Sequence, residues 1–306
     1  MDKKIMSSVL AARKDRLRFA ETEIEMIKEK AFSYPDISAS QRKFSDSVFE
    51  DLKNGGNGKS QAVMSAKSAY ASSLHAHGFD ESMFVVAIEC GKCHDTGVYN
   101  GKLCECVWKE YISALKADCD LSTRAPFTFA DCKLDVVSNE TQREELSALY
   151  DLLFAYANKY PNITKYNLVL SGGTGTGKTC LASAVANKML DRGQSVQFLS
   201  AYEFNTTMLS CHTSQIAARD AILYKILNCD LLVIDDLGTE PMLRNVTVEY
   251  LLLALSERFI SKHATLITTN LTFDRILEIY GERIYSRLAD KRHSLCIELR
   301  GKDLRR

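Results

Sequence analysis

The chain has 306 residues and no net charge at neutral pH, because 39 lysines and arginines balance 39 aspartates and glutamates. This length allows one sizeable α/β core with a smaller appended part, and the balanced charge argues against tight, unassisted DNA binding. No run approaches the roughly 20 apolar residues that cross a membrane, and the charged amino-terminal stretch lacks the apolar core of a signal peptide. We therefore expect a cytoplasmic protein that does not contact membranes.

The amino-terminal third is predicted to be helical. Residues 5–30 place apolar side chains at three- and four-residue steps, which predicts an amphipathic helix that Arg13 interrupts. The glycine- and asparagine-rich run at 54–58 predicts a loop, and a second helix is expected over about 61–75. We expect residues 1–106 to form helices that lead into a compact cysteine-rich knob, with a helical linker at 107–125.

The knob contains four of the ten cysteines within 17 residues, in two closely spaced pairs: Cys90, Cys93, Cys104 and Cys106. Asn100-Gly101 predicts a tight hairpin turn that folds the pairs toward each other. Four thiolates placed in this way surround Zn²⁺ tetrahedrally, and a site with all ligands used is structural. His94 is an alternative ligand in place of one cysteine. A redox C-x-x-C pair, which does not need the second pair, is the alternative to a metal site.

From about residue 126, short apolar runs rich in β-branched residues alternate with helical segments. Five strands are predicted, at 166–170, 195–200, 231–235, 265–269 and 294–299. Strands separated by helices form a parallel sheet with helices on both faces, so we expect residues 126–306 to be one α/β domain. The last strand is followed by RGKDLRR, and no helical lid domain is expected there.

The segment SGGTGTGKT at 171–179 matches the phosphate-binding pattern G-x-x-x-x-G-K-[ST], with a predicted strand before it and a helix after it. Its glycines let backbone N–H groups curl around phosphate oxygens, and the helix N-terminus adds positive potential. Lys178 is expected to reach the β- and γ-phosphates of ATP, and Thr179 to coordinate Mg²⁺. The predicted nucleotide-binding residues are Gly172, Gly173, Thr174, Gly175, Thr176, Gly177, Lys178, Thr179, Cys180, Asp235 and Arg305.

Polar residues at two later strand ends complete the predicted catalytic set. Asp235 is expected to hold the magnesium, directly or through water, and Asp236 to orient and deprotonate the attacking water. Many ATPases of this class carry glutamate at the second position, and two solvated acids at a strand end are the structural alternative. Asn270 is placed as a polar sensor of the γ-phosphate or the lytic water, with helix capping as the alternative.

Arginines near the carboxyl end are candidates for contacts with the reacting phosphate. In GERIYSRLAD (281–290), Arg287 occupies the place expected of an arginine finger that acts on the ATP of a neighbouring subunit, with Arg283 as the fallback. A surface arginine on a helix is otherwise simply solvated. Arg305, beyond the last strand, is a candidate second sensor of phosphate.

Together these motifs resemble the bacterial replicative-helicase loaders of the DnaC/DnaI kind, and more closely their zinc-containing DnaI-like branch. The resemblance is carried by HGF (77–79), CGKCHDTG with the second cysteine pair, the phosphate-binding loop, IDDLGTE (234–240), Arg258, TTN (268–270) and GERIYSRL (281–288). It implies an AAA+ P-loop NTPase core, with a five-stranded parallel sheet between helices and no C-terminal lid, preceded by a small helical, zinc-binding domain at 1–106.

The resemblance also implies ATP, Mg²⁺ and Zn²⁺ as cofactors and self-association through the ATP sites, with residues 172–179, Asp235, Asp236 and Asn270 from one subunit and Arg287 from the next. Residues 1–106 would dock on the hexameric replicative DNA helicase, and the ATPase domains would assemble around single-stranded DNA. The segment between the second and third strands offers only Tyr202, Phe204 and Arg219 for that contact. We expect weak DNA binding by a single subunit, and packing of these rings in the core is the alternative.

Two other functions fit the motifs. A transposition helper ATPase of the IstB kind has a closely similar ATPase domain, but such helpers typically lack the zinc knob, which favours the loader. An adaptor that binds ATP as a switch and barely hydrolyses it is the third hypothesis, which an aspartate at position 236 permits.

Overall fold

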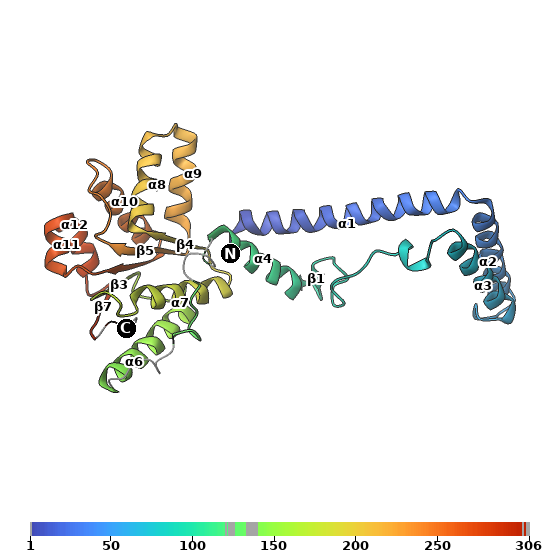
Figure 1. The fold of residues 1–306 in the computed structure, drawn as a ribbon, viewed down its shortest axis with the longest axis horizontal. Helices are drawn as coiled ribbons and strands as arrows, with labels where there is room; N and C mark the ends of the chain where they lie inside the picture. The colour runs from blue at the N-terminus through green and yellow to red at the C-terminus, as the bar shows by residue number, and fades with distance from the viewer. Residues whose placement is uncertain (1, 120, 122–125, 133–139, 302, 304–306) are drawn as a thin grey trace. The chain divides into compact units, whose positions relative to one another are not determined.

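The structure, a computed structural model, describes residues 2–119, 121, 126–132, 140–301 and 303. They fall into two compact units, Ser7–Val107 and a second unit that combines Met1–Met6 with Trp108–Arg306 (Figure 1). Within the described part of the chain, no helix is both long and apolar enough to span a bilayer.

The unit Ser7–Val107 begins with helices. They are α1 (Lys3–Phe32), which starts in the other unit, α2 (Pro35–Lys53), α3 (Gln61–Ala76) and the short 3-10 helix η1 (Glu81–Phe84). The Ser60 side chain caps α3, and buried Ile37, Tyr70 and Leu74 form the small core that α2 and α3 share. The predicted helices at 5–30 and 61–75, and the loop at 54–58, are confirmed.

A hairpin and the start of a helix complete this unit. β1 (Val98–Tyr99) pairs antiparallel with β2 (Lys102–Leu103). Asn100 and Gly101 have φ angles of 50° and 71°, the left-handed backbone of a two-residue hairpin turn, so the predicted turn is confirmed. α4 (Glu105–Cys119) begins earlier than the linker helix expected from residue 107, because the amide of Val107 donates to the carbonyl of Cys104 and closes the first turn there.

The sheet of the second unit has five strands: β3 (Asn167–Gly172), β4 (Val196–Ser200), β5 (Leu231–Leu237), β6 (Ala264–Thr269) and β7 (Ser294–Leu299). They lie in the order β4-β5-β6-β3-β7, and every neighbouring pair is parallel. The predicted five-stranded parallel sheet is therefore confirmed. The carboxyl ends of β3, β6 and β5 meet at one edge, where open parallel sheets bind ligands.

Helices cover both faces of this sheet: α6 (Glu140–Lys159), α7 (Lys178–Asp191), α8 (Ala201–Thr213), α9 (Ile216–Asn228), α10 (Thr247–Ile260), α11 (Phe273–Tyr280) and α12 (Glu282–Ala289). Figure 1 shows α6 and α7 on one side and α8, α9 and α10 on the other. Leu232 and Ile234 of β5 pack in the core beneath α8 and α10, and the equally buried Leu231 and Val233 alternate with them toward the opposite face. Burial on both faces explains why β3, β5 and β6 contain continuous apolar runs.

Arg258 of α10 is fully buried within this unit. Its guanidinium donates to the carbonyl oxygens of Ile226 at 2.7 Å, Cys229 at 2.9 Å and Ala264, and to the hydroxyl of Thr265 at 3.1 Å. The fork of guanidinium donors thus ties the end of α9 to the start of β6. Arg258, one of the residues that carry the family resemblance, has a structural role.

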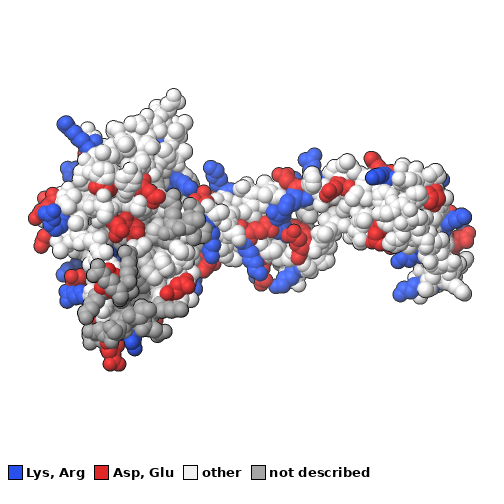
Figure 2. All heavy atoms as spheres, viewed as in Figure 1, with Lys and Arg blue, Asp and Glu red and all other residues white. Residues whose placement is uncertain are grey.

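The charged side chains show no separation by sign on the face drawn in Figure 2. Lysines and arginines are interspersed with aspartates and glutamates there, as the balanced composition of the chain leads one to expect. Any electrostatic attraction of this face for nucleic acid is therefore local.

Candidate functional site: a phosphate-binding loop and a four-cysteine knob

The phosphate-binding loop joins β3 to α7, and three of its glycines, Gly172, Gly175 and Gly177, have positive φ angles. Gly172 has a φ angle of 146°, and a Cβ there would lie 2.3 Å from the carbonyl oxygen of Leu299. Gly177 has a φ angle of 94° and directly precedes α7. The chain therefore enters α7 through a tight turn, and the first amides of the helix have no intrahelical partners. This is the arrangement that binds phosphate.

Lys178, the first residue of α7, is only 5% exposed. Its ammonium donates to the carbonyl oxygens of Gly172 at 2.9 Å and of Gly173 at 2.6 Å. The positive charge is thus held against the loop itself, where the phosphates of a nucleotide would bind.

Asp235, at the carboxyl end of β5, is linked to the start of α7. The Thr179 hydroxyl donates to Asp235 Oδ1 at 3.1 Å, and the Thr268 hydroxyl of β6 donates to the same oxygen at 2.6 Å. Burial raises the pKa of Asp235, while the hydrogen bond from Thr268 favours the charged form. The structure therefore brings together the two residues predicted to hold magnesium, Thr179 and Asp235.

Thr268 is a site residue that the sequence analysis did not single out. Besides donating to Asp235, its oxygen accepts a hydrogen bond from the backbone N–H of Asp236 at 2.8 Å. One hydroxyl thus positions both predicted acidic residues. The available signal was its place at the polar end of a predicted strand, in the segment TTN (268–270).

Asp236 occupies an irregular point of β5. The pairing of β5 with β6 shifts register between Ile234 and Leu237, and Asp236 has a φ angle of 56°. A bulge of this kind redirects side chains, and such irregularities are frequent beside active sites. The carboxylate of Asp236 is half-buried at the edge of the sheet.

Asn270 follows β6 and is exposed. The residue that caps α11 is Thr272, whose side chain accepts from the amide of Arg275. The helix-capping alternative for Asn270 is therefore wrong, and its assignment as a sensor stays a prediction.

Arg287 is exposed on α12. Its guanidinium contacts the carbonyl oxygen of Arg283 at 3.4 Å, whereas its own carbonyl oxygen accepts from Asn167 Nδ2 at 3.3 Å and from Ser294 Oγ at 2.9 Å. The backbone of Arg287 is thus anchored to the sheet, while its charged group lies at the surface. Arg283 is exposed as well. Arg305 lies outside the described residues.

The segment predicted to contact single-stranded DNA forms α8 and α9. Phe204 is 4% exposed and belongs to the hydrophobic core, so its assignment as a stacking residue is wrong. Tyr202 and Arg219 are exposed, and so is Tyr224, which the sequence analysis did not mention. Phe204 lies two residues from Tyr202, and the turn of a helix places such residues on different faces.

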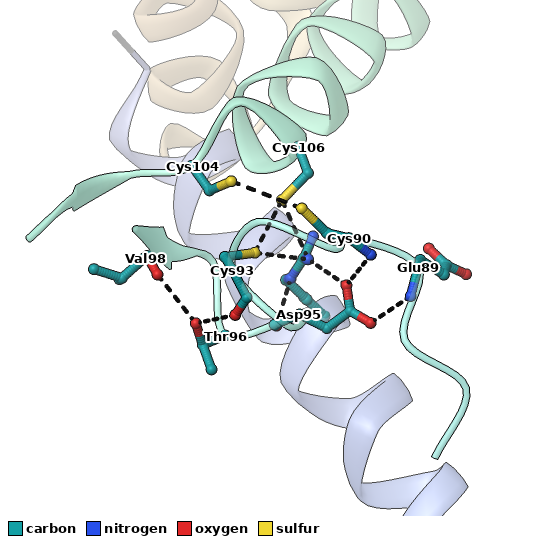
Figure 3. A network of polar contacts seen from close by, with 9 residues as sticks. Glu89, Cys90, Cys93, Asp95, Thr96, Val98, Cys104 and Cys106 are labelled. Atoms are coloured by element: carbon teal, nitrogen blue, oxygen red, sulfur yellow. Dashed lines mark hydrogen bonds and ion pairs between the residues drawn. The ribbon is translucent and has the colours of Figure 1, made fainter. Parts of the chain in front are cut away.

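The four cysteines of the knob meet at one point. Their Sγ atoms all lie within 4.8 Å of one another, with 3.8 Å between Cys90 and Cys104 and 3.4 Å between Cys93 and Cys106. Figure 3 shows the four sulfur atoms pointing toward one another. Tetrahedral bonds of about 2.3 Å to zinc place sulfur atoms about 3.8 Å apart, so this donor set fits Zn²⁺. The group consists of cysteines alone, and the described His94 is not part of it.

Arg13 and Asp95 lie beside the sulfur cluster, and both are buried. Arg13 Nη2 contacts Asp95 Oδ1 at 3.0 Å, the Sγ of Cys106 at 3.3 Å and the Sγ of Cys93 at 3.9 Å. Asp95 also accepts from the backbone N–H of Glu89 at 2.8 Å and of Cys90 at 3.0 Å (Figure 3). The charged residue that interrupts the apolar stripe of α1 is thus part of the knob, a role that the sequence analysis missed.

Part of the second unit matches known proteins. Residues 154–305 match the family described as IstB-like ATP binding protein. The replicative helicase loader DnaC of Escherichia coli strain K12 is 31% identical over 124 residues, which are 40% of this chain and 49% of that protein. The DnaC of Buchnera aphidicola from Acyrthosiphon pisum is 28% identical over 167 residues, 52% of this chain and 64% of that protein. The chain thus spans about half the length of the Escherichia coli relative.

Two solved structures also match part of this chain. The crystal structure of DnaI has a TM-score of 0.45 and 22% identity, and the match covers 58% of this chain and 90% of that one. The crystal structure of the DnaC helicase loader has a TM-score of 0.44 and 19% identity, with 55% and 98% of the two chains covered.

Proposed function

We propose that this chain, whose residues 154–305 form an IstB/DnaC-like ATPase domain, is an ATP-dependent loader that delivers a hexameric replicative DNA helicase onto single-stranded DNA. The observation that carries the proposal is the combination, in one chain, of this ATPase domain with a four-cysteine knob on an amino-terminal helical unit. The ATPase domain provides the energy-dependent step, and residues 1–106 are proposed as the part that docks on the helicase.

The ATPase chemistry follows from the groups at the sheet edge. Lys178 exchanges its two carbonyl contacts for oxygens of the β- and γ-phosphates. Thr179 and Asp235 share a hydrogen bond and are the residues that would hold Mg²⁺, which neutralises phosphate charge when bound. Asp236 accepts the proton of the attacking water, and Asn270 orients that water.

The arginine that completes the site is proposed to come from a second copy of the chain. The Arg287 guanidinium is at the surface while its backbone is anchored by Asn167 and Ser294, which suits a group that reaches a neighbouring subunit. Hydrolysis would then depend on assembly, and ATP would control how the loader holds its partners. We propose weak single-strand contacts through Tyr202 and Arg219.

A specific finding favours the second candidate, a transposition helper of the IstB kind, because the matching family model is described by that name. The two functions differ in the partner. A loader binds the replicative helicase, whereas a helper would use ATP to select or remodel DNA for a transposase.

The test is a pull-down of the purified full-length protein with the replicative helicase of its host, in the presence of ATP and of ADP. We expect a complex whose amount changes with the nucleotide. Removal of residues 1–106 should abolish the complex and leave nucleotide binding in place, and Lys178→Ala should remove the nucleotide dependence. If no complex forms with either nucleotide, the loader function is wrong, and the same preparation is then tested for ATP-dependent binding to double-stranded DNA.

A further inference from the structure

Two cysteines outside the knob lie close together beside the phosphate-binding loop. Cys180 follows Thr179 directly in the first turn of α7, and its Sγ lies 3.0 Å from the Sγ of Cys132. Both side chains are half-buried. Neither belongs to the four-cysteine group, which consists of Cys90, Cys93, Cys104 and Cys106.

The backbone around Cys132 is held in place from two helices. The carbonyl oxygen of Phe127 accepts from Ser183 Oγ and Asn187 Nδ2 of α7, each at 2.9 Å. The carbonyl oxygen of Phe129 accepts from the Tyr150 hydroxyl of α6 at 2.7 Å. The proximity of the two sulfur atoms is therefore supported by contacts that hold the segment before Cys132 against α7 and α6.

We propose that Cys132 and Cys180 form a reversible disulfide that controls nucleotide binding at the adjacent loop. A disulfide bond is about 2.05 Å long, so the sulfur atoms need to approach by roughly 1 Å. Cytosolic disulfides are uncommon and mostly transient or redox-sensing, and a pair beside a nucleotide site fits that use.

The chemistry of the pair assigns different roles to the two thiols. Cys180 lies in the first turn of α7, whereas Cys132 lies in no helix of the described residues. The start of a helix favours a thiolate. Cys180 is thus the nucleophile and Cys132 the resolving thiol.

With a small disulfide such as oxidised glutathione as the oxidant, the Cys180 thiolate attacks one sulfur and releases one glutathione thiolate. Cys132 then attacks the Sγ of Cys180 and expels the second glutathione. The two protein thiols lose two electrons and two protons, and one glutathione disulfide becomes two glutathione thiols.

The consequence for the nucleotide site follows from the position of Cys180. It is the neighbour of Thr179, whose hydroxyl donates to Asp235. Closing the sulfur pair pulls the first turn of α7 toward residues 126–132 and moves Thr179 relative to Asp235. We expect weaker binding of Mg-ATP in the oxidised form. This effect rests on the proposed ATPase function, whereas formation of the disulfide does not.

Peptide mapping tests the disulfide itself. The full-length zinc-loaded protein is equilibrated in buffers with increasing ratios of oxidised to reduced glutathione, alkylated and digested with trypsin. Each cysteine then lies in a short peptide with no other cysteine, APFTFADCK (125–133) and TCLASAVANK (179–188). We expect the two peptides to appear linked, and to separate after treatment with dithiothreitol. If only a glutathione adduct of Cys180 forms across the whole range, the proposal is wrong.

Binding of a fluorescent ATP analogue with Mg²⁺ tests whether the disulfide controls nucleotide binding. We expect oxidation to weaken binding by at least about tenfold, and dithiothreitol to restore it. Cys132→Ser should bind the analogue like the reduced wild type before oxidation, and after oxidation the same peptide mapping should show a glutathione adduct on Cys180. This variant retains the knob cysteines, so a loss of binding in molecules whose Cys180 carries no adduct would assign the effect to the knob and contradict the proposal. A reduced protein that binds no nucleotide would overturn the ATPase function and leave the mapping result intact.

Discussion

The guanidinium of Arg13 lies between the carboxylate of Asp95, at 3.0 Å, and the sulfur of Cys106, at 3.3 Å. A Zn²⁺ ion bound by four thiolates carries a net charge of −2, and this charge is costly beside buried groups unless a cation compensates it. The buried guanidinium would offset part of that charge, and the Asp95 that it contacts holds the turn that carries Cys90 and Cys93.

We expect Arg13→Ala to weaken zinc binding by about 10- to 100-fold, the usual cost of removing a group that orients metal ligands. Competition for Zn²⁺ with a coloured chelator measures this affinity directly. Arg18→Ala is the matched control, because Arg18 lies on the same helix, has the same charge and is exposed. Equal zinc affinities of the two variants would mean that Arg13 only fills space beside the cluster.

Replacement of Asp235 is expected to stabilise the nucleotide-free protein while it destroys function. Burial raises the pKa of Asp235, so its negative charge at pH 7 costs folding free energy. This cost falls as the pH drops through the raised folded pKa toward the ordinary value. Asp235→Asn should therefore have a higher melting temperature than the wild type at pH 7, and the difference should shrink at pH 5.

Melting curves of the two proteins at both pH values check this, and Asp220→Asn is the control because Asp220 is exposed on α9. The same Asp235 variant should lose Mg²⁺-dependent hydrolysis, since it removes the charge that the metal needs. A lower melting temperature at pH 7 would mean that the hydrogen bonds from Thr179 and Thr268 outweigh the cost of burial.

Thr268 is expected to act by positioning Asp235 and the backbone of Asp236 rather than by contact with ATP. Thr268→Val keeps the shape and removes the hydroxyl, so kcat should fall by about tenfold or more while KM for ATP changes little. Thr268→Ser restores the hydroxyl and should recover kcat. A Ser variant as slow as the Val variant would point to packing of the lost methyl group instead.

The sequence was sufficient for the features that local patterns determine. The inner strands β3, β5 and β6 were recognisable because both of their faces are buried, which leaves continuous apolar runs. Asn100-Gly101 identified the hairpin because few residue pairs accept two positive φ angles. The same turn brings the cysteine pairs together, so the four-cysteine group could be predicted as a whole.

The features that could not be predicted from the sequence depend on contacts between segments that lie far apart in the chain. Arg13 and Asp95 are 82 positions apart, and an arginine in an apolar stripe does not reveal its partner. Thr268 meets Asp235 only because β6 lies beside β5 in the sheet. Cys132 and Cys180, 48 positions apart, carry no shared motif.

Arg287 provides the sharpest test of the proposed shared ATP site. Arg287→Ala should bind ATP normally and lose hydrolysis by about 10³-fold or more, whereas Lys178→Ala should fail to bind ATP. Each variant alone is then inactive.

When the two variants are mixed, a Lys178→Ala subunit can still offer its Arg287 to the intact loop of an Arg287→Ala subunit. We expect the mixture to regain part of the activity, measured as phosphate release under assembly conditions. Arg283→Ala is the control, since Arg283 is also exposed on α12, and it should stay active alone. A mixture as inactive as its components would mean that Arg287 does not act on a neighbouring subunit.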